Sequence, residues 1–176
     1  MPPSEKTAAP MAPRSGLDSL MIERATHQHV PYLRRLKENV MASRYRPTSD
    51  PEEFERWREV YCTENYFHDL IDDPAAMLLC IGSLSDPVGM VVLRRAPDHL
   101  EIDDLLCLVP RQGDGTRLLV SALRFAEAWR FDTVAIDVYP QRDNEDFLLG
   151  HGFTHERDAA NDLGQPMHRY VRGVGS

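Results

Sequence analysis

Residues 105–119 read LLCLVPRQGDGTRLL, which is typical of a strand that passes through a glycine loop into a helix. The apolar run predicts a buried strand, which Pro110 ends. Gly113 and Gly115 form a short loop, and the apolar spacing after them predicts a first helical turn. Backbone N–H groups at a helix N-terminus are unpaired, and the helix dipole favours negative charge there. The stretch therefore predicts an anion-binding corner.

Strands are predicted on both sides of this corner. The apolar-rich runs at residues 77–83, 87–95 and 99–109 are joined by turns too short for a crossover, which predicts an antiparallel meander. A helix over residues 115–130 is followed by an alternating, β-branched run at residues 132–139. A strand, a helix and a strand in this order predict a right-handed parallel crossover.

The remaining segments complete the order of elements. A short strand at residues 21–25 is followed by a helix that begins after Thr26 and by a second helical region. That region begins at residues 49–53, where cap residues, a proline and acids stand together. A brief helix at residues 141–149 and two strands around a turn at residues 161–165 follow. This order predicts an α/β (α+β) fold with a mixed sheet.

Length and composition predict one domain with a leader before it. Residues 1–20 are rich in proline, alanine and serine and lack periodicity, so we expect a disordered leader and a domain at residues 21–176. The aromatic-rich part of this domain suits either core packing or the mouth of a substrate site, and the sequence leaves both open. The side chains in question are those of Tyr45, Arg46, Tyr61, Tyr66 and His68.

Charge and cysteine content argue against several classes of protein. The net charge of −8 disfavours an extended nucleic-acid surface or an anionic membrane surface, and it favours cationic partners such as amines. No apolar run reaches the length of a membrane span. The three cysteines show neither a disulfide framework nor metal-ligand spacing, so we expect a reducing, cytoplasmic location and no metal.

The glycine loop alone is weak evidence for a phosphate site, because Asp-Gly is also a common turn. A dinucleotide-binding fingerprint would need glycine at Leu118, and a P-loop would need Gly-Lys followed by Ser or Thr. Both patterns are missing from the stretch. The context of the loop, between an apolar strand and an amphipathic helix, is what raises its significance.

In its element order and motifs, the chain resembles the GNAT superfamily of acyl-CoA-dependent N-acyltransferases over residues 21–171. In that family the fourth strand runs into a Gln/Arg-x-x-Gly-x-Gly/Ala loop, and Gly113 and Gly115 match its glycines. Other stretches similar to family motifs are Thr116-Arg117-Leu118-Leu119, Val109-Pro110, and Phe147 with Gly152-Phe153. The resemblance implies a mixed, mostly antiparallel sheet of about six to seven strands with about four helices around it.

Two positions depart from the family pattern. The family's basic or amide residue falls at Pro110, so the loop is shortened, and Arg111 or Gln112 is left to supply that function. The usual general-acid tyrosine falls at Leu148, whose side chain cannot donate a proton. The alternatives to a general acid at this position are Tyr139, a water, or departure of the thiolate without an acid.

The resemblance implies that acetyl-CoA is the co-substrate, with no metal, and that its pyrophosphate binds at the glycine loop. Backbone N–H groups of residues 112–117 would hold the pyrophosphate, and Arg111 and Arg117 would add cationic charge. Asp114 is unfavourable there unless it points outward. The pantetheine arm would pair with the edge of the strand at residues 107–109. The residues expected to bind the cofactor are Cys107, Leu108, Val109, Gln112, Gly113, Asp114, Gly115, Thr116 and Arg117.

Acyl transfer to an amine needs a base that removes a proton from the nucleophile. Family bases commonly lie on the fourth or fifth strand. Here the fourth strand offers Glu101, Asp103 and Asp104, and the fifth offers Asp137. On an alternating strand Glu101 and Asp103 share one face, and Asp104 takes the other. The alternative for each acid is a solvated position on the strand.

These inferences predict an N-acetyltransferase that transfers an acetyl group from acetyl-CoA to a primary amine by direct attack on the thioester. The alternative is a catalytically degenerate acyl-CoA-binding module with a regulatory or sensor role, which Leu148 and the shortened loop favour. Glu101, Asp103 and Asp137 favour the enzyme. The expected partner is a small-molecule or peptide amine, with neither nucleic acid nor membrane, and the resemblance allows a homodimer.

Overall fold

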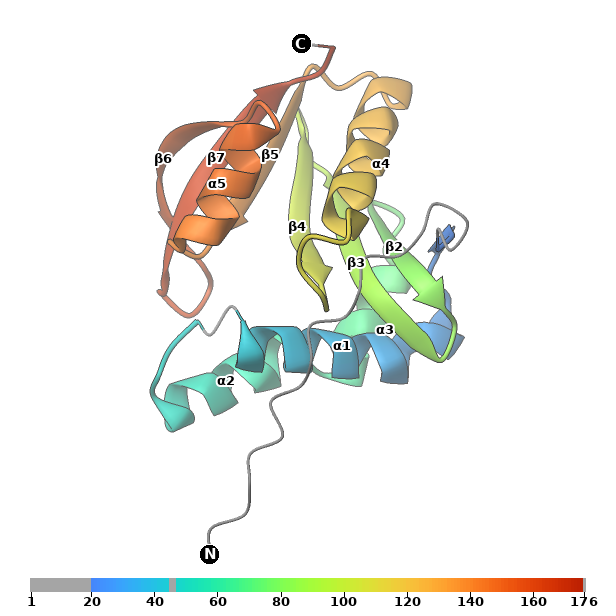
Figure 1. The fold of residues 1–176 in the computed structure, drawn as a ribbon, viewed down its shortest axis with the longest axis vertical. Helices are drawn as coiled ribbons and strands as arrows, with labels where there is room; N and C mark the ends of the chain where they lie inside the picture. The colour runs from blue at the N-terminus through green and yellow to red at the C-terminus, as the bar shows by residue number, and fades with distance from the viewer. Residues whose placement is uncertain (1–19, 45–46, 176) are drawn as a thin grey trace, which may run out of the picture.

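One seven-stranded sheet forms the centre of the molecule, with its strands in the order β1-β2-β3-β4-β5-β7-β6 (Figure 1). The computed structural model describes residues 20–44 and 47–175. The leader predicted for residues 1–20, apart from its last residue, and the candidate residues Tyr45 and Arg46 lie outside this description. The strands are β1 (Ile22–Arg24), β2 (Ala76–Ser83), β3 (Asp86–Arg95), β4 (Leu100–Cys107), β5 (Thr133–Val138), β6 (Thr154–Ala160) and β7 (Pro166–Gly173).

The pairing of these strands confirms the predicted mixed, mostly antiparallel sheet. The first four strands form an antiparallel series, β4 and β5 are parallel, and β7 is antiparallel to both β5 and β6. Helix α4 connects the two parallel strands. The helical elements are η2 (His27–His29), α1 (Val30–Ser43), α2 (Pro51–Tyr61), α3 (Glu64–Asp72), α4 (Asp114–Ala128) and α5 (Arg142–Gly150). Within the described part of the chain, no helix combines the length and the apolar character needed to cross a membrane.

The second helical region of the sequence is divided into two helices. The predicted start is confirmed, because the Asp50 side chain accepts a hydrogen bond from the N–H of Glu52 and Pro51 is the first residue of α2. After α2 ends, the hydroxyl of Thr63 accepts a hydrogen bond from the N–H of Tyr66 at 3.1 Å and starts α3. Two helices therefore supply the aromatic side chains on this side of the sheet, and Trp57 of α2 and Phe67 of α3 belong to the same core.

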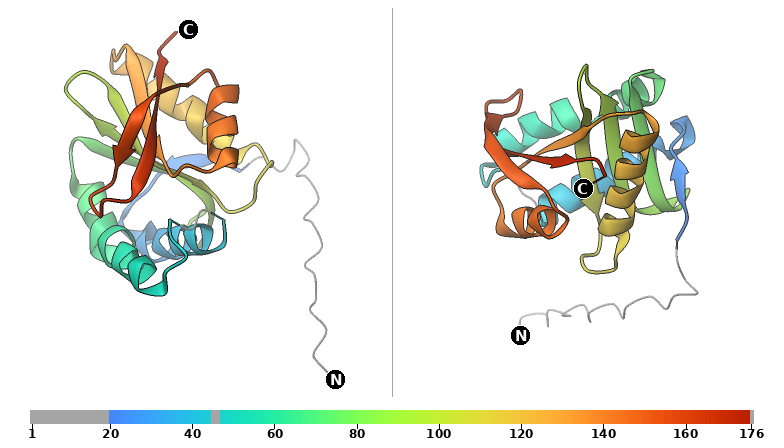
Figure 2. Two further views of the ribbon diagram at one scale, coloured as in Figure 1. Left: turned by 90° about the vertical axis from the view of Figure 1, so that its left-hand side faces the viewer. Right: turned by 90° about the horizontal axis from the view of Figure 1, so that it is seen from above.

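Helices cover both faces of the sheet (Figures 1 and 2). On β2 and β3, the side chains of Leu78 and Met90 belong to a core with α1, α2 and α3. Their neighbours Leu79 and Val91 belong to a second core with α4 and α5. Both faces of these central strands are therefore buried, which explains why their sequences are continuous apolar runs rather than alternating ones.

The two parallel strands stay together for only a short length. Residues 100–102 of β4 pair with residues 134–136 of β5, and beyond this point β4 pairs only with β3 and β5 only with β7. The strands diverge from there toward the glycine loop (Figure 1). The divergence exposes backbone edges inside the sheet, and it is where the functional residues gather.

Candidate active site

Two cavities border each other where β4 and β5 diverge, and both are lined by Leu105, Ile136, Val138 and Asn144. The loop cavity, with a volume of about 400 Å³, is lined by residues 109–116 and by Arg44, Cys107, Phe147 and Leu148, among others. The aromatic cavity, with a volume of about 440 Å³, is lined by Lys37, Trp57, Tyr61, Tyr66 and Tyr139 and by a set of acids. The shared wall places the glycine loop and the acids on two sides of one opening in the sheet.

The glycine loop sets the N-terminus of α4 inside the loop cavity. Gly113 is the N-cap residue and has a φ of +82°, a left-handed conformation that is costly for a residue with a Cβ. A Cβ at Gly115 would lie 3.5 Å from the Phe147 ring and 3.6 Å from Cys107 Sγ, which is ordinary contact distance. The fold therefore needs glycine at position 113, whereas glycine at position 115 leaves space in the cavity.

Most of the residues predicted to bind the cofactor line the loop cavity. Leu108 and Arg117 are the exceptions, because neither lines the cavity. The Leu108 N–H donates to the Val88 carbonyl at 2.8 Å, and the Arg117 N–H donates to the Gly113 carbonyl at 3.0 Å. Those that line it are Cys107, Val109, Gln112, Gly113, Asp114, Gly115 and Thr116.

Asp114 does not point outward, which is the orientation that would have kept its charge away from a bound phosphate. It is the first residue of α4, its exposed fraction is 3%, and it lines the loop cavity. A carboxylate is stabilised there because the helix dipole is positive at this end. The Asp114 carboxylate therefore offsets part of the positive potential at the N-terminus of α4, which would otherwise attract a phosphate.

Arg44 is a loop-cavity residue that the sequence analysis missed. It follows α1 directly, and its Nη1 donates to the Cys107 carbonyl at 2.6 Å. Together with Arg111 it brings a second arginine to the cavity wall. No local pattern could have indicated this, because Arg44 and Cys107 lie 63 residues apart in the sequence.

The aromatic cavity is lined by five acidic and two basic residues. The acids come from β4, β5 and the turn before β7, and the bases from α1 and β3. The cavity therefore has an excess of negative charge, which favours a cationic ligand. These residues are Glu101, Asp103, Asp104, Asp137 and Asp162 with Lys37 and Arg94.

A bulge in β4 gives its acids a different orientation from the one that strict alternation predicts. Leu93 of β3 faces Ile102, but the next residue, Val92, faces Asp104, so Asp103 is an extra residue without a partner in the pairing. Strict alternation would have turned Asp104 away from Glu101. The bulge resets the alternation, and both side chains line the aromatic cavity.

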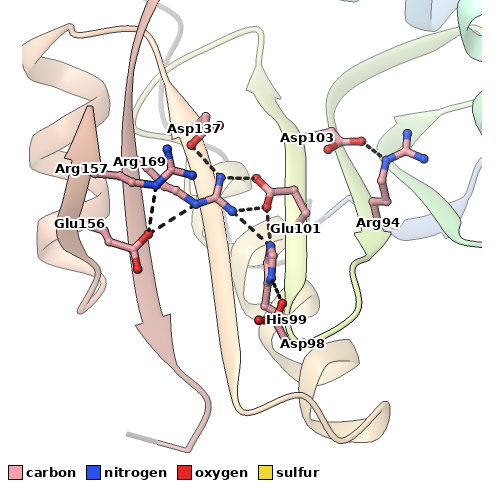
Figure 3. A network of polar contacts seen from close by, with 9 residues as sticks. All are labelled: Arg94, Asp98, His99, Glu101, Asp103, Asp137, Glu156, Arg157 and Arg169. Atoms are coloured by element: carbon pink, nitrogen blue, oxygen red, sulfur yellow. Dashed lines mark hydrogen bonds and ion pairs between the residues drawn. The ribbon is translucent and has the colours of Figure 1, made fainter. Parts of the chain in front are cut away.

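Arg169 of β7 bridges two of the predicted bases (Figure 3). Its Nη2 donates to Glu101 Oε2 at 2.6 Å and its Nη1 to Asp137 Oδ1 at 2.9 Å, and its side chain is 12% exposed. His99 contacts the same carboxylate, with Nε2 2.7 Å from Glu101 Oε2. Burial alone would lower the pKa of His99, but hydrogen bonds to Asp98 and Glu101 outweigh it and raise the pKa above its usual value. The network ties β4, β5 and β7 together beside the divergence.

Asp103 belongs to a separate pair. Arg94 donates from Nε to Asp103 Oδ2 at 2.8 Å (Figure 3). Its Nη1 donates to Asp73 Oδ2 at 2.7 Å. Burial raises the pKa of Asp103 above its usual value, although the nearby guanidinium works in the opposite direction. A carboxylate with a raised pKa is a stronger base near neutral pH.

Lys37 and Asp104 form a second pair that the sequence analysis did not single out. Lys37 is 2% exposed, and its Nζ donates to Asp104 Oδ2 at 2.6 Å. A signal was present, because Lys37 lies on the apolar stripe of α1 between Leu33 and Val40. A lysine in such a stripe indicates either a long side chain that reaches solvent or a buried charge with a partner.

Tyr139 lies at the end of β5 with its hydroxyl held by two side chains. The hydroxyl donates to Gln165 Oε1 at 3.3 Å and accepts from Asn161 Nδ2 at 3.2 Å. Burial raises the pKa of Tyr139 to about 12. Leu148, at the position of the family tyrosine, is buried in the wall of the loop cavity.

Among the described residues, one group of three side chains brings potential metal-ligand atoms close together. None of the three residues lines either cavity. The group consists of Glu23, His29 and Cys80. The His29 Nδ1 accepts the N–H of Thr26 at 3.0 Å, so the ring hydrogen is on Nε2, which points at Glu23. Burial raises the pKa of Cys80 to about 11. The Cys80 thiol donates to the Glu23 carbonyl at 3.7 Å, so the three residues form a hydrogen-bonded group beside β1 and β2.

Comparisons with known proteins reveal similarity at the level of the fold. No protein-family model matches the chain, and no curated protein matches its sequence. The PaiA N-acetyltransferase from Thermoplasma acidophilum, solved in complex with coenzyme A, is similar at a TM-score of 0.76 and 16% identity over 88% of this chain and 99% of that one. A GCN5-related N-acetyltransferase from Rhodopseudomonas palustris is similar at 0.74 and 15% over 89% and 97%.

A third solved structure, an aminoglycoside 6'-acetyltransferase type Ii, is similar at a TM-score of 0.63 and 13% identity over 89% of this chain and 98% of that one. Each likeness spans nearly the whole of the described residues and nearly the whole of the other protein. The chain therefore has the fold of the GNAT N-acetyltransferases.

Proposed function

We propose that this chain, which has the GNAT fold, is an N-acetyltransferase that transfers an acetyl group from acetyl-CoA to a primary amine by direct attack on the thioester. The observation that carries the proposal is the pair of cavities that share a wall where β4 and β5 diverge. One cavity contains a helix N-terminus that suits an anionic cofactor, and the other contains acids and aromatic rings that suit an amine.

The loop cavity supports binding of the coenzyme. The N-terminus of α4 presents backbone N–H groups, and Arg44 and Arg111 add two guanidinium groups for a pyrophosphate. Beyond Ile102, the edge of β4 that faces away from β3 pairs with no other strand in the described part of the chain and offers backbone groups to an amide-bearing arm. One of the similar structures was solved in complex with coenzyme A.

The aromatic cavity supports the chemistry on the acceptor side. A primary amine is protonated in water, so it must lose a proton before its nitrogen forms a bond to the thioester carbon and the thiolate leaves. Asp137, Glu101 and Asp103 line the cavity and are the proposed bases, directly or through a water. Tyr139 or a water would protonate the leaving thiolate. No histidine among the described residues lines either cavity, which favours direct transfer over a thiol–imidazole nucleophile.

Two observations favour a second candidate, an acyl-CoA-binding sensor without turnover. Leu148 replaces the usual acid, and Asp114 is buried at the N-terminus of α4 where a phosphate would bind. A sensor needs the loop cavity but not the acids of the aromatic cavity.

Ligand binding and thiol release test the proposal. Acetyl-CoA at about 1 mM should raise the melting temperature, because a ligand that binds only the folded state stabilises it. No shift at saturating ligand would contradict both candidates. Release of free thiol above the hydrolysis background, across polyamines, aminoglycosides, amino acids and peptides, would establish the enzyme. A melting shift without any such release would favour the sensor.

A further inference from the structure

Lys37 is buried at the centre of the N-terminal helices, with its ammonium group surrounded by aromatic rings. Its Nζ lies 4.5 Å from the ring centre of Tyr66 and 5.8 Å from that of Trp57. Tyr61, at 5.8 Å, and Phe67, at 6.0 Å, complete the cage. Rings from α2 and α3 thus surround a cation from α1. The arrangement is typical of a recognition site for an ammonium ion, and the protein's own lysine fills it.

The cage and Asp104 together stabilise this buried ammonium group. A buried ammonium needs both an opposite charge and hydrogen-bond acceptors, and Asp104 Oδ2 supplies them at 2.6 Å. The Lys37 side chain is 3% exposed, so solvent contributes little. A charged, enclosed amine is a poor nucleophile, which argues against Lys37 as an acyl acceptor. Any effect of Lys37 on the reaction must therefore act through Asp104, the carboxylate that it contacts.

Asp104 differs from Glu101 in having one carboxylate oxygen that accepts no hydrogen bond from the described residues. Asp103 and Asp137 share this feature, but only the Asp104 carboxylate is paired with the caged Lys37. Glu101 uses both oxygens on Arg169, with Oε1 at 3.2 Å and Oε2 at 2.6 Å. Lys37 uses only Oδ2 of Asp104, and no hydrogen bond to Oδ1 is found among the described residues. The Asp104 side chain is 18% exposed and lines the cavity.

The position of Asp104 along β4 connects it to the opening between the cavities. The next residue, Leu105, lines both cavities, so Asp104 stands beside the wall that they share. The bulge at Asp103 is what turns Asp104 toward the aromatic cavity. Without the bulge, the carboxylate would face the core of α4.

We propose that Lys37 is a positioning residue for the acceptor. It holds the Asp104 carboxylate in its orientation, so that the second carboxylate oxygen receives the ammonium group of the incoming amine beside the opening to the loop cavity. Because Lys37 already fills the aromatic cage, the acceptor's charge is directed to Asp104 instead of to the rings. This inference rests on the proposed acetyltransferase function.

The test separates positioning from simple stabilisation with a double-mutant cycle. The variants are Lys37→Met, which keeps the length and removes the charge, Asp104→Asn, and the two combined. The acceptor is the amine of the thiol-release panel that the parent protein turns over fastest. Its KM and kcat are measured at saturating acetyl-CoA, together with the melting temperature of each variant. We expect both single variants to raise the acceptor KM at least tenfold while the acetyl-CoA KM changes less than twofold. The double variant should regain melting temperature relative to Lys37→Met but not acceptor KM.

Two further variants complete the experiment. Lys37→Arg keeps a cation for the cage and for Asp104, so it should retain more acceptor affinity than Lys37→Met. Arg34→Met is the matched control, because Arg34 lies on α1 and pairs with Glu38 at the surface, away from the cavities.

The outcomes are distinguishable. If the double variant regains both stability and acceptor KM, the pair is structural and this inference is overturned. An unchanged acceptor KM in folded Lys37→Met and Asp104→Asn, with normal turnover by the parent protein, overturns it as well. If the parent protein releases no thiol with any amine, the proposed function fails, and this inference fails with it.

Discussion

The loop cavity and the aromatic cavity hold charge in different ways. The positive potential of the loop cavity comes from backbone N–H groups at one helix end and from arginines on its wall. In the aromatic cavity, four of the five acids, all except Asp162, are each paired with a cation from another element. These pairs are Asp103 with Arg94, Asp104 with Lys37, and Glu101 and Asp137 with Arg169. We therefore expect substitutions in the aromatic cavity to act on folding and those in the loop cavity to act mainly on ligand binding.

The largest effect should come from Arg169→Met. This change leaves Glu101 and Asp137, which are 17% and 32% exposed, without their shared cation. Breaking a largely buried ion pair from one side costs about 3 kcal/mol, because an unpaired charge remains. Urea unfolding would measure the loss. Arg157→Met on β6 is the control, since Arg157 pairs with Glu156 at the surface and should cost at most about 0.5 kcal/mol. Equal losses in the two variants would contradict the pairing argument.

The fold could be predicted because its signals are local. Apolar runs, caps and short turns each lie within one segment, and the order of segments limits the sheet to few topologies. Much of the loop cavity was accessible too, since the continuous stretch of residues 109–116 supplies eight of its eighteen lining residues. Only the division of the aromatic region into α2 and α3 was not foreseen, because the cap at Thr63 lies within a continuous polar and aromatic pattern.

The aromatic cavity could be predicted only in part. Glu101, Asp103 and Asp137 were accessible because they lie on strands next to the loop. The pair of Lys37 with Asp104 spans 67 residues, and no local pattern connects them. A bulge also adds one residue to β4 without a clear sequence signal, and this reversed the predicted face of Asp104. Sequence periodicity predicts the face of the sheet on which a side chain lies only where the strand is regular.

A pair of glycine substitutions tests the loop cavity. Gly113→Ala should cost about 1 to 2 kcal/mol of stability, because alanine disfavours the left-handed φ even though nothing lies within 4 Å of the added Cβ. Gly115→Ala meets ordinary contacts and should leave stability nearly unchanged, but its methyl group takes space in the cavity. Thermal unfolding with and without acetyl-CoA would separate the two. A smaller ligand-induced shift is expected for Gly115→Ala, and an unchanged shift would place the pyrophosphate elsewhere.

Removal of the buried acid of the loop cavity should strengthen binding. Asp114→Asn deletes a negative charge at the N-terminus of α4, so the affinity for acetyl-CoA should rise about threefold while stability falls by less than about 1 kcal/mol. Titration calorimetry would measure the affinity. Asp143→Asn is the control, since Asp143 lines the same cavity but is exposed, and its charge is screened by water. A gain in both variants would indicate a general charge effect.

The smallest effect should be a pH dependence at the edge of the aromatic cavity. The pKa of His99 is raised in the folded state, because hydrogen bonds to Asp98 and Glu101 outweigh burial. The folded state therefore holds its proton more tightly than the unfolded chain. The stabilisation from His99 is full below its unfolded pKa of about 6.5 and is lost as the pH rises through the folded pKa.

The His99→Gln variant makes this term measurable. The difference in urea midpoint between the parent protein and the variant should shrink from about pH 6 to about pH 8, by an amount on the order of a few tenths of a kcal/mol. The same substitution at His155, which is exposed on β6, is the control. A difference that stays constant with pH would mean that His99 contributes as a neutral hydrogen-bond partner of Glu101. Protonation of His99 would then make no contribution to the stability of the ion pairs in the aromatic cavity.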